Sequence, residues 1–169
     1  MLLLCACGRT PDPENTLYLD LKDGRVVIEL RPDLAPAHVA RIKKLVRAHF
    51  YDGLKFFRVL DGFMAQTGDP TATGFGGSGV KLRAEFSDEP FERGTVGMAR
   101  AGDPNSADSQ FFICFDSAPG LTGQYTVLGK VVDGMKFVDR IRKGDPAGDG
   151  YVAEPDAIVR MQVAADVRQ

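Results

Sequence analysis

The sequence contains no tryptophan, and it has only two histidines and three cysteines among its 169 residues. His38 and His49 lie far apart in the chain, and Cys5 and Cys7 lie at the extreme N-terminus, distant from Cys114. These spacings match neither a zinc-ligand set nor a paired disulfide framework. We therefore expect no bound metal and no cofactor, and we interpret Cys114 as a small buried apolar residue.

The chain also lacks an excess of charge of either sign and a long hydrophobic run. Its formal net charge is −2, and no Lys/Arg-rich block is present. The basic surface typical of nucleic-acid binding is therefore missing, and no run approaches the ~20 apolar residues that span a membrane. A hydrophobic content of 44% and a length of 169 residues suit one globular domain, for which we expect a monomer.

The N-terminus differs in composition from the rest of the chain. Residues 4–7 read LCAC, which looks like a bacterial lipobox, where a cysteine becomes acylated. The apolar stretch is shorter than the about 7–15 residues of an export signal, and no basic residue precedes it, so we expect the true start upstream. We predict a truncated lipoprotein signal and tether at residues 1–13, lipidation at Cys7, and a folded domain at residues 14–167. A lipid anchor in the periplasm or cell envelope follows, with the cytoplasm as the alternative.

Short strands dominate the pattern that follows. Leu17, Leu19 and Leu21 alternate with polar residues, residues 26–30 form a partner run, and the Asp-Gly pair at residues 23–24 predicts a hairpin between them. Further strands are predicted at residues 55–60, 62–67, 95–100, 110–115, 126–132 and 156–163. Many short strands broken by Gly-rich loops indicate a sandwich or a barrel, and propensity alone does not choose between them.

Two helices interrupt the strands. Pro36 opens a predicted helix over residues 36–49, because proline is favoured in the first helical turn. Its apolar stripe includes Val39 and Ile42, and His38 falls off that stripe, so we expect His38 to be solvated. A second helix is predicted over residues 134–142, with Met135, Val138 and Ile141 facing inward.

One glycine-rich segment matches a dinucleotide fingerprint by letters alone. Residues 74–79 read GFGGSG, which fits G-x-G-x-x-G. That fingerprint binds a pyrophosphate only between a parallel strand and a helix that begins at the last glycine. Residues 80–90 do not have a helical pattern, so we interpret the segment as a flexible surface loop and not as a nucleotide site.

Two further segments carry the most specific pattern. Residues 56–69 read FFRVLDGFMAQTGD, and residues 109–115 read SQFFICF. Period-two spacing puts Arg58, Phe63 and Gln66 within reach of one exposed face. Taken singly, a Phe in a strand is usually core and an Arg is usually solvated. In this order and separation, however, the two segments closely resemble the active-site strands of the cyclophilins, the peptidyl-prolyl cis-trans isomerases.

The resemblance covers about residues 15–165 and implies both fold and activity. It implies a closed, eight-stranded antiparallel β-barrel capped by a helix at each end. It also implies an isomerase that acts on X-Pro bonds in proline-containing peptides and unfolded protein clients. The alternative is a proline-peptide binding or holdase module on the same fold, without catalysis, and the presence of Arg58 favours the enzyme.

The resemblance also implies roles for individual residues. Arg58 would stabilise the twisted amide, and Gln66 would hold Arg58 and bind a substrate carbonyl. The expected substrate-binding residues are Phe63, Met64, Ala99, Arg100, Gln110, Phe112, Leu121 and Tyr125. Ala99 and Arg100 would contribute backbone groups.

Two positions depart from the pattern of many eukaryotic members. Gly120 stands where they have tryptophan. Tyr125 stands where they have histidine, and this tyrosine resembles the bacterial members. The glycine removes a large wall of the implied site, so we expect weak binding of cyclosporin-type ligands, with Arg58 and the proline pocket unaffected.

Overall fold

The computed structural model describes residues 11–168, so the predicted lipidation site Cys7 lies outside the described residues. In chain order, the strands and α-helices are β1 (Thr16–Leu21), β2 (Gly24–Leu30), α1 (Pro36–Arg47), β3 (Arg58–Leu60), β4 (Met64–Thr67), β5 (Thr95–Met98), β6 (Phe111–Cys114), β7 (Val127–Asp133), α2 (Met135–Val138) and β8 (Arg160–Val163). Short 3₁₀ turns include η2 (Pro119–Leu121) and η3 (Pro146–Gly148). Every predicted strand is present, and most are shorter than predicted.

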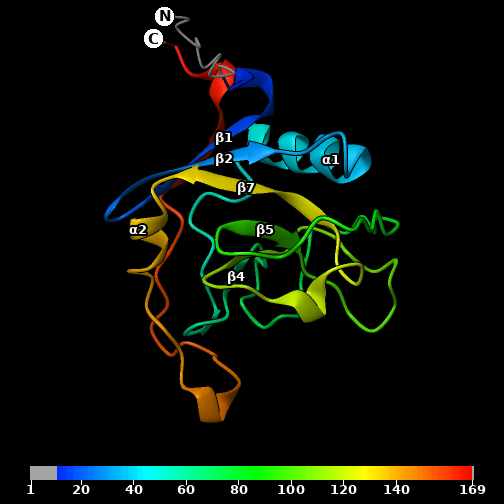
Figure 1. The fold of residues 1–169 in the computed structure, drawn as a ribbon. Helices are drawn as coiled ribbons and strands as arrows, with labels where there is room; N and C mark the ends of the chain where they lie inside the picture. The colour runs from blue at the N-terminus through cyan, green and yellow to red at the C-terminus, as the bar shows by residue number, and fades with distance from the viewer. Residues whose placement is uncertain (1–10, 169) are drawn as a thin grey trace, which may run out of the picture.

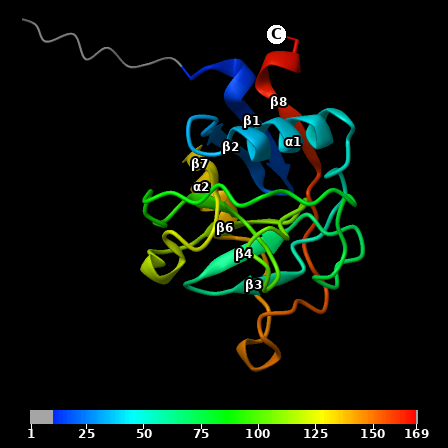
Figure 2. The ribbon, with the colours of Figure 1, turned by 90° about the vertical axis from the view of Figure 1, so that its right-hand side faces the viewer.

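All eight strands belong to one antiparallel sheet, in the order β3-β4-β6-β5-β7-β2-β1-β8. The sheet curls around the core, and α1 and α2 lie at opposite ends of it (Figures 1 and 2). Within the described residues, no ladder pairs the edge strands β3 and β8 with each other. An isolated bridge joins Lys55, shortly before β3, to Ala157, shortly before β8. The eight-stranded antiparallel fold with two helices is confirmed. A closed barrel was an overstatement, because the seam between the edge strands is irregular.

The predicted hairpin is present at the start of the sheet. β1 and β2 pair from Thr16↔Glu29 to Leu21↔Gly24, with the tight turn between them. Leu17, Leu19 and Leu21 of β1 are buried, as their alternation with polar residues predicts.

Both helices are shorter than predicted. α1 ends at Arg47, and His49 beyond it has a φ of +58°, which lies outside the helical region. α2 is a single turn, after which the N–H groups of Arg140 and Ile141 bond three residues back instead of four. Val138 and Ile141 are buried as predicted, and Met135 is only partly buried.

The prediction that His38 is solvated was wrong. Its side chain is fully buried, and its Nδ1 lies 2.6 Å from Oε2 of Glu85. The Glu85 carboxylate also accepts the backbone N–H groups of Ala37 and His38, so a distant loop caps the first turn of α1. Burial alone would raise the pKa of Glu85, but these hydrogen bonds outweigh it and hold the pKa below its usual value.

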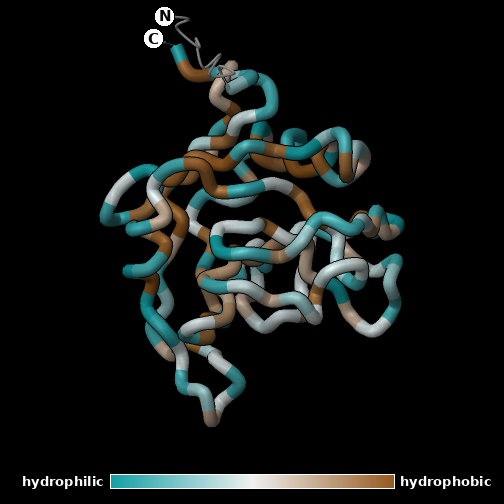
Figure 3. The backbone as a smooth tube through the Cα atoms, in the orientation of Figure 1, coloured by the Kyte–Doolittle hydropathy of each residue, from teal (hydrophilic) through white to brown (hydrophobic). Residues whose placement is uncertain are grey.

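The core is divided into two clusters of apolar side chains. The larger cluster lies between the sheet and α1, and the smaller one is formed by Met64, Phe91, Phe112, Cys114 and Val127. Figure 3 shows the most hydrophobic stretches along the packed strands and α1, with mainly hydrophilic peripheral loops. Cys114 is buried as predicted, and burial raises the pKa of its thiol to about 12. Within residues 11–168, no helix has the length and apolar character to cross a membrane.

Candidate active site

Strand register brings Arg58, Gln66 and Phe112 together. Arg58 of β3 pairs with Gln66 of β4, and Gln66 pairs with Phe112 of β6. Residues directly opposite each other in a sheet place their side chains on the same face. A row of one cation, one amide and one aromatic ring therefore crosses three neighbouring strands.

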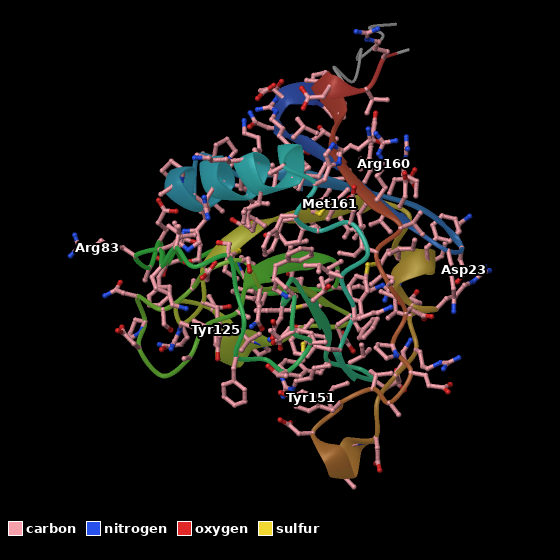
Figure 4. The ribbon with its side chains drawn as sticks, turned by 180° about the vertical axis from the view of Figure 1, so that it is seen from behind. Asp23, Arg83, Tyr125, Tyr151, Arg160 and Met161 are labelled. Atoms are coloured by element: carbon pink, nitrogen blue, oxygen red, sulfur yellow. The ribbon has the colours of Figure 1, made fainter. Side chains whose placement is uncertain are left out.

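This row forms the floor of an open cavity of about 320 Å³. The cavity is lined by Arg58, Phe63, Met64, Gln66, Gly74, Ala99, Arg100, Phe112, Leu121, Tyr125, Asp149 and Tyr151. In Figure 4, Tyr125 and Tyr151 appear on the same lower part of the molecule, Tyr151 near the loop that contains η3. The structure thus gathers every predicted catalytic and substrate-binding residue except Gln110 around one cavity, and Gln110 lines an adjoining cavity of about 270 Å³.

The Arg58 side chain is fixed by two partners. Its Nε donates to the Asp149 carbonyl oxygen and its Nη2 donates to Asp149 Oδ1, each at 2.9 Å. Its Nη1 donates to Gln66 Oε1 at 3.3 Å. These bonds engage three of the five guanidinium N–H groups, so among residues 11–168 one N–H on each terminal nitrogen has no partner and is available to a substrate.

Gln66 continues this chain of hydrogen bonds in the opposite direction. Its Nε2 donates to Gln110 Oε1 at 2.8 Å, so its amide orientation is fixed on both sides. The Nε2 of Gln110 in turn donates to the carbonyl oxygens of Gly74 and Gly76. Gln110 therefore connects the floor of the cavity to the glycine-rich loop.

That loop is held by two carboxylates, which revises the expectation of a flexible segment. Asp69 is almost fully buried and accepts the N–H groups of Thr71, Thr73, Gly74 and Gly76. Burial alone would raise the pKa of Asp69, but these bonds outweigh it and lower the pKa. The loop follows β4, and no helix lies between it and β5, as the lack of a helical pattern in residues 80–90 predicted.

A second buried carboxylate holds the far end of the loop. Asp108 accepts hydrogen bonds from the backbone N–H groups of Ser78 and Gly79 and from the Ser78 hydroxyl. Lys81 lies 3.7 Å from the same carboxylate. The loop thus has a defined position beside the cavity.

Aromatic side chains build the apolar wall. The Phe112 ring stacks on Phe91, with centroids 5.8 Å apart, and meets Tyr125 edge-on at 5.9 Å. Gly97 of β5 makes room for this arrangement, because a Cβ at this position would lie 2.5 Å from Phe112 and 2.6 Å from Phe91. Phe63, Leu121 and Tyr125 are partly buried and complete the wall. The result is an apolar surface of packed aromatic and aliphatic side chains.

The segment after β5 forms the opposite rim. The Ala99 N–H donates to the Gln110 carbonyl oxygen. The Arg100 guanidinium lies 4.8 Å from the centroid of the Tyr125 ring and donates to the Gln124 carbonyl oxygen. The Arg100 side chain therefore packs against Tyr125 beside the cavity, a contact that the sequence did not predict.

Sequence reasoning missed Asp149 and Tyr151. The Tyr151 ring packs against Phe57 at 6.0 Å, and its hydroxyl donates to the Thr73 carbonyl oxygen. Both residues come from a loop about ninety positions after Arg58. The sequence signal there is a turn-forming Asp-Gly pair, which predicts a bend and not a site.

Gly120 leaves the outer rim of the cavity open. It lies in η2, directly before Leu121, and apart from its two chain neighbours no described residue lies within 4 Å of a Cβ placed on it. The departure noted in the sequence therefore corresponds to unoccupied space at the edge of the apolar wall.

The arrangement suits stabilisation of a polar group beside an apolar ring. The cavity lining combines a fixed guanidinium and an amide with aromatic and aliphatic side chains. The lining residues include no cysteine, serine or histidine, and their one carboxylate, on Asp149, is hydrogen-bonded to Arg58.

Comparisons with known proteins agree with this geometry. The family model described as cyclophilin type peptidyl-prolyl cis-trans isomerase matches residues 16–163. A probable peptidyl-prolyl cis-trans isomerase of Brucella suis is 58% identical over 93% of this chain and 86% of its own length. Peptidyl-prolyl cis-trans isomerase B of Bacillus subtilis is 43% identical over 78% of this chain and 93% of its own.

Solved structures give the same result. A cyclophilin from Hirschia baltica superposes with a TM-score of 0.84 at 29% identity, covering 95% of this chain and 77% of that chain. A cyclophilin type isomerase of Cryptosporidium parvum, crystallised in the presence of the dipeptide Ala-Pro, gives a TM-score of 0.79 at 28% identity, covering 88% and 98%. The chain belongs to the cyclophilin-type peptidyl-prolyl cis-trans isomerases, the enzymes that accelerate rotation about X-Pro bonds.

Proposed function

We propose that Arg58 is the catalytic residue of this isomerase and that the apolar wall binds the substrate proline ring. Rotation of an X-Pro bond must overcome a barrier of ~18–20 kcal/mol, because amide resonance is lost. In the twisted state the prolyl nitrogen regains its lone pair and becomes a hydrogen-bond acceptor. A donor aimed at that nitrogen therefore binds the transition state more tightly than the planar ground state.

The geometry of Arg58 carries this proposal. Two of its N–H groups remain after the bonds to Asp149 and Gln66, and the side chain lines the same cavity as Phe112. A proline ring against Phe63, Met64 and Phe112 would place its nitrogen on the side where Arg58 stands. Guanidinium keeps its charge at any physiological pH and presents a planar fork, which suits this task better than an ammonium group.

The remaining cavity residues would hold the peptide on either side of the proline. Gln66 is proposed to bind a substrate carbonyl oxygen through its amide group while it contacts Arg58. The Ala99 N–H is already bonded to Gln110, so Ala99 would contribute through its carbonyl oxygen. A rate gain of about 10⁵ requires ~7 kcal/mol, which one charge-assisted hydrogen bond in a partly dry cavity supplies together with conformational selection by the wall.

Exchange NMR on a short Ala-Pro peptide tests the proposal against simple peptide binding. We expect catalytic amounts of the protein to broaden the separate cis and trans resonances of the peptide, because exchange becomes faster. Shifted peptide resonances with an unchanged exchange rate would contradict catalysis and favour a binding module on the same fold.

We further propose a location and a client class for the enzyme. The LCAC run at residues 4–7 supports acylation at Cys7 and attachment to the cell envelope, where the monomeric enzyme would act on unfolded proteins. Stable attachment requires more than one acyl chain, as a lipoprotein has. Labelling with a fatty acid in the native host, from the chromosomal locus, should mark the wild-type protein and not the Cys7→Ser variant. An unlabelled wild-type protein in the soluble cytoplasmic fraction would contradict this location.

A further inference from the structure

The loop of residues 144–150 is fastened to β3 one residue from the catalytic arginine. The Val59 N–H donates to the Gly150 carbonyl oxygen, and the Val59 carbonyl oxygen accepts the N–H of Gly144, both at 2.8 Å. A Cβ at Gly144 would lie 1.9 Å from the Gly150 oxygen, and a Cβ at Gly150 would lie 2.6 Å from Leu60 Cγ. The two glycines therefore allow both ends of the loop to close against the strand.

The interior of the loop is also ordered by hydrogen bonds. The Asp145 carboxylate accepts the N–H of Ala147, and the Asp145 carbonyl oxygen accepts the N–H groups of Gly148 and Gly150. Asp149 has a φ of +56°, in the left-handed region that favours glycine and tolerates aspartate and asparagine. This conformation is maintained because both of its neighbours along the loop are bonded.

Asp149 makes the closest contacts to Arg58. Its carbonyl oxygen accepts a hydrogen bond from Arg58 Nε, and its Oδ1 accepts one from Nη2, each at 2.9 Å. The bond from Nη1 to Gln66 Oε1 is longer, at 3.3 Å. When two acceptors bind adjacent N–H groups of one guanidinium, they fix both the position and the plane of that group. The orientation of the catalytic fork therefore depends more on the loop than on Gln66.

We propose that Asp149 is a positioning residue for catalysis: its side-chain oxygen orients the Arg58 guanidinium so that the two free N–H groups face the bound proline. This inference rests on the proposed role of Arg58. The carboxylate also offsets part of the positive charge, but the Asp149 side chain is 72% exposed, so water screens this effect. Orientation is therefore the larger contribution.

Substitution by glycine and by asparagine tests the proposal without straining the backbone. Asp149→Gly removes the side-chain acceptor and suits the positive φ, so the fold is retained. We expect kcat/KM to fall roughly tenfold through kcat, since the interaction acts in the transition state, with KM nearly unchanged. Asp149→Asn keeps an acceptor oxygen and should restore activity to within about threefold of wild type. As a matched control, Ala147→Gly adds a glycine to the same loop and should leave kcat/KM within twofold.

A double-mutant cycle separates this inference from the mechanism itself. If Asp149 acts through Arg58, Asp149→Gly should change the residual activity of Arg58→Ala by less than twofold. Wild-type activity in Asp149→Gly, no recovery in Asp149→Asn, or an undiminished loss in the Arg58→Ala background would each overturn the positioning role. Full activity of Arg58→Ala alone would instead overturn the proposed mechanism. NMR of the Arg58 Nε–H group gives a readout that does not depend on activity. Its resonance should be sharp in the folded wild-type protein, and Asp149→Gly should shift it.

Discussion

Arg58 and Gln66 lie directly opposite each other in the β3–β4 ladder, and the arginine Nη1 donates to the glutamine Oε1 at 3.3 Å. The glutamine amide is fixed in turn by Gln110, which is bonded to the glycine-rich loop. The guanidinium of Arg58, which we propose to be catalytic, is thus connected through two neutral amides to the backbone of a loop. Disturbing either amide should affect catalysis more than it affects the fold.

Gln66→Ala should lower kcat/KM roughly tenfold. Loss of one hydrogen bond to a charged group costs about 1.5–3 kcal/mol, and the length of this bond places it at the lower end. Gln162→Ala, which removes a partly buried glutamine from β8 outside the cavity, serves as the matched control and should keep full activity. The measurement is a protease-coupled isomerisation assay, and equal activity of the two variants would exclude a role for Gln66.

Asp69→Asn should lower the free energy of unfolding at neutral pH. It should also make that free energy fall less steeply as the pH is lowered. The pKa of Asp69 is lowered in the folded protein from 3.8, so its ionised form contributes stability above that pH. This contribution is lost as the pH falls through the lowered pKa. We expect a destabilisation of about 1–3 kcal/mol at pH 7, because a buried carboxylate that accepts several N–H groups is replaced.

Urea unfolding between pH 2 and pH 7 measures this effect. The difference between wild type and Asp69→Asn should be greatest near neutral pH and should shrink in strong acid. Asp61→Asn, at an exposed position before Phe63, is the control and should follow the wild-type curve. A constant difference at every pH would show that the Asp69 charge does not stabilise the loop.

Cyclosporin should inhibit this enzyme weakly, and Gly120→Trp should strengthen the inhibition. Apart from its two chain neighbours, no described residue lies within 4 Å of a Cβ placed on Gly120, so the rim has room for a larger side chain at this position. A large aromatic anchor typically contributes ~2 kcal/mol or more to an interface, which corresponds to at least roughly thirtyfold in affinity. Peptide turnover should change much less, since Arg58 and Phe112 are unaffected. Nanomolar inhibition of the wild-type protein would contradict this interpretation of the rim.

Local sequence patterns were sufficient where neighbours in the chain or in the ladder determine the structure. Alternation predicted the buried face of β1, and the Asp-Gly pair predicted the turn to β2. The two segments that resemble cyclophilins lie on adjacent strands, so their residues meet by register. The grouping of Arg58, Gln66 and Phe112 was predicted from the resemblance to the cyclophilins and not from local pattern, because β4 and β6 are remote in the chain and pair only in the folded sheet.

Features that depend on distant partners could not be predicted in this way. His38 lies off the apolar stripe of its helix, yet Glu85 from a later loop buries it and caps the helix. Asp149 meets Arg58 only because Val59 bonds both ends of a loop near the C-terminus. No local sequence pattern predicts these contacts, because each contact joins two segments that are remote in the chain and meet only in the folded sheet.

Substitution of Arg58 tests the central claim most directly. Removing a donor that acts in the transition state should lower kcat/KM of Arg58→Ala by about two to three orders of magnitude. Arg58→Lys should recover little of this loss, because an ammonium group lacks the planar fork that Asp149 and Gln66 hold. The measurement is kcat/KM on a short X-Pro peptide in the protease-coupled assay, with folding verified by circular dichroism. A large loss in well-folded Arg58→Ala is the predicted result, and full activity in that variant would contradict the mechanism.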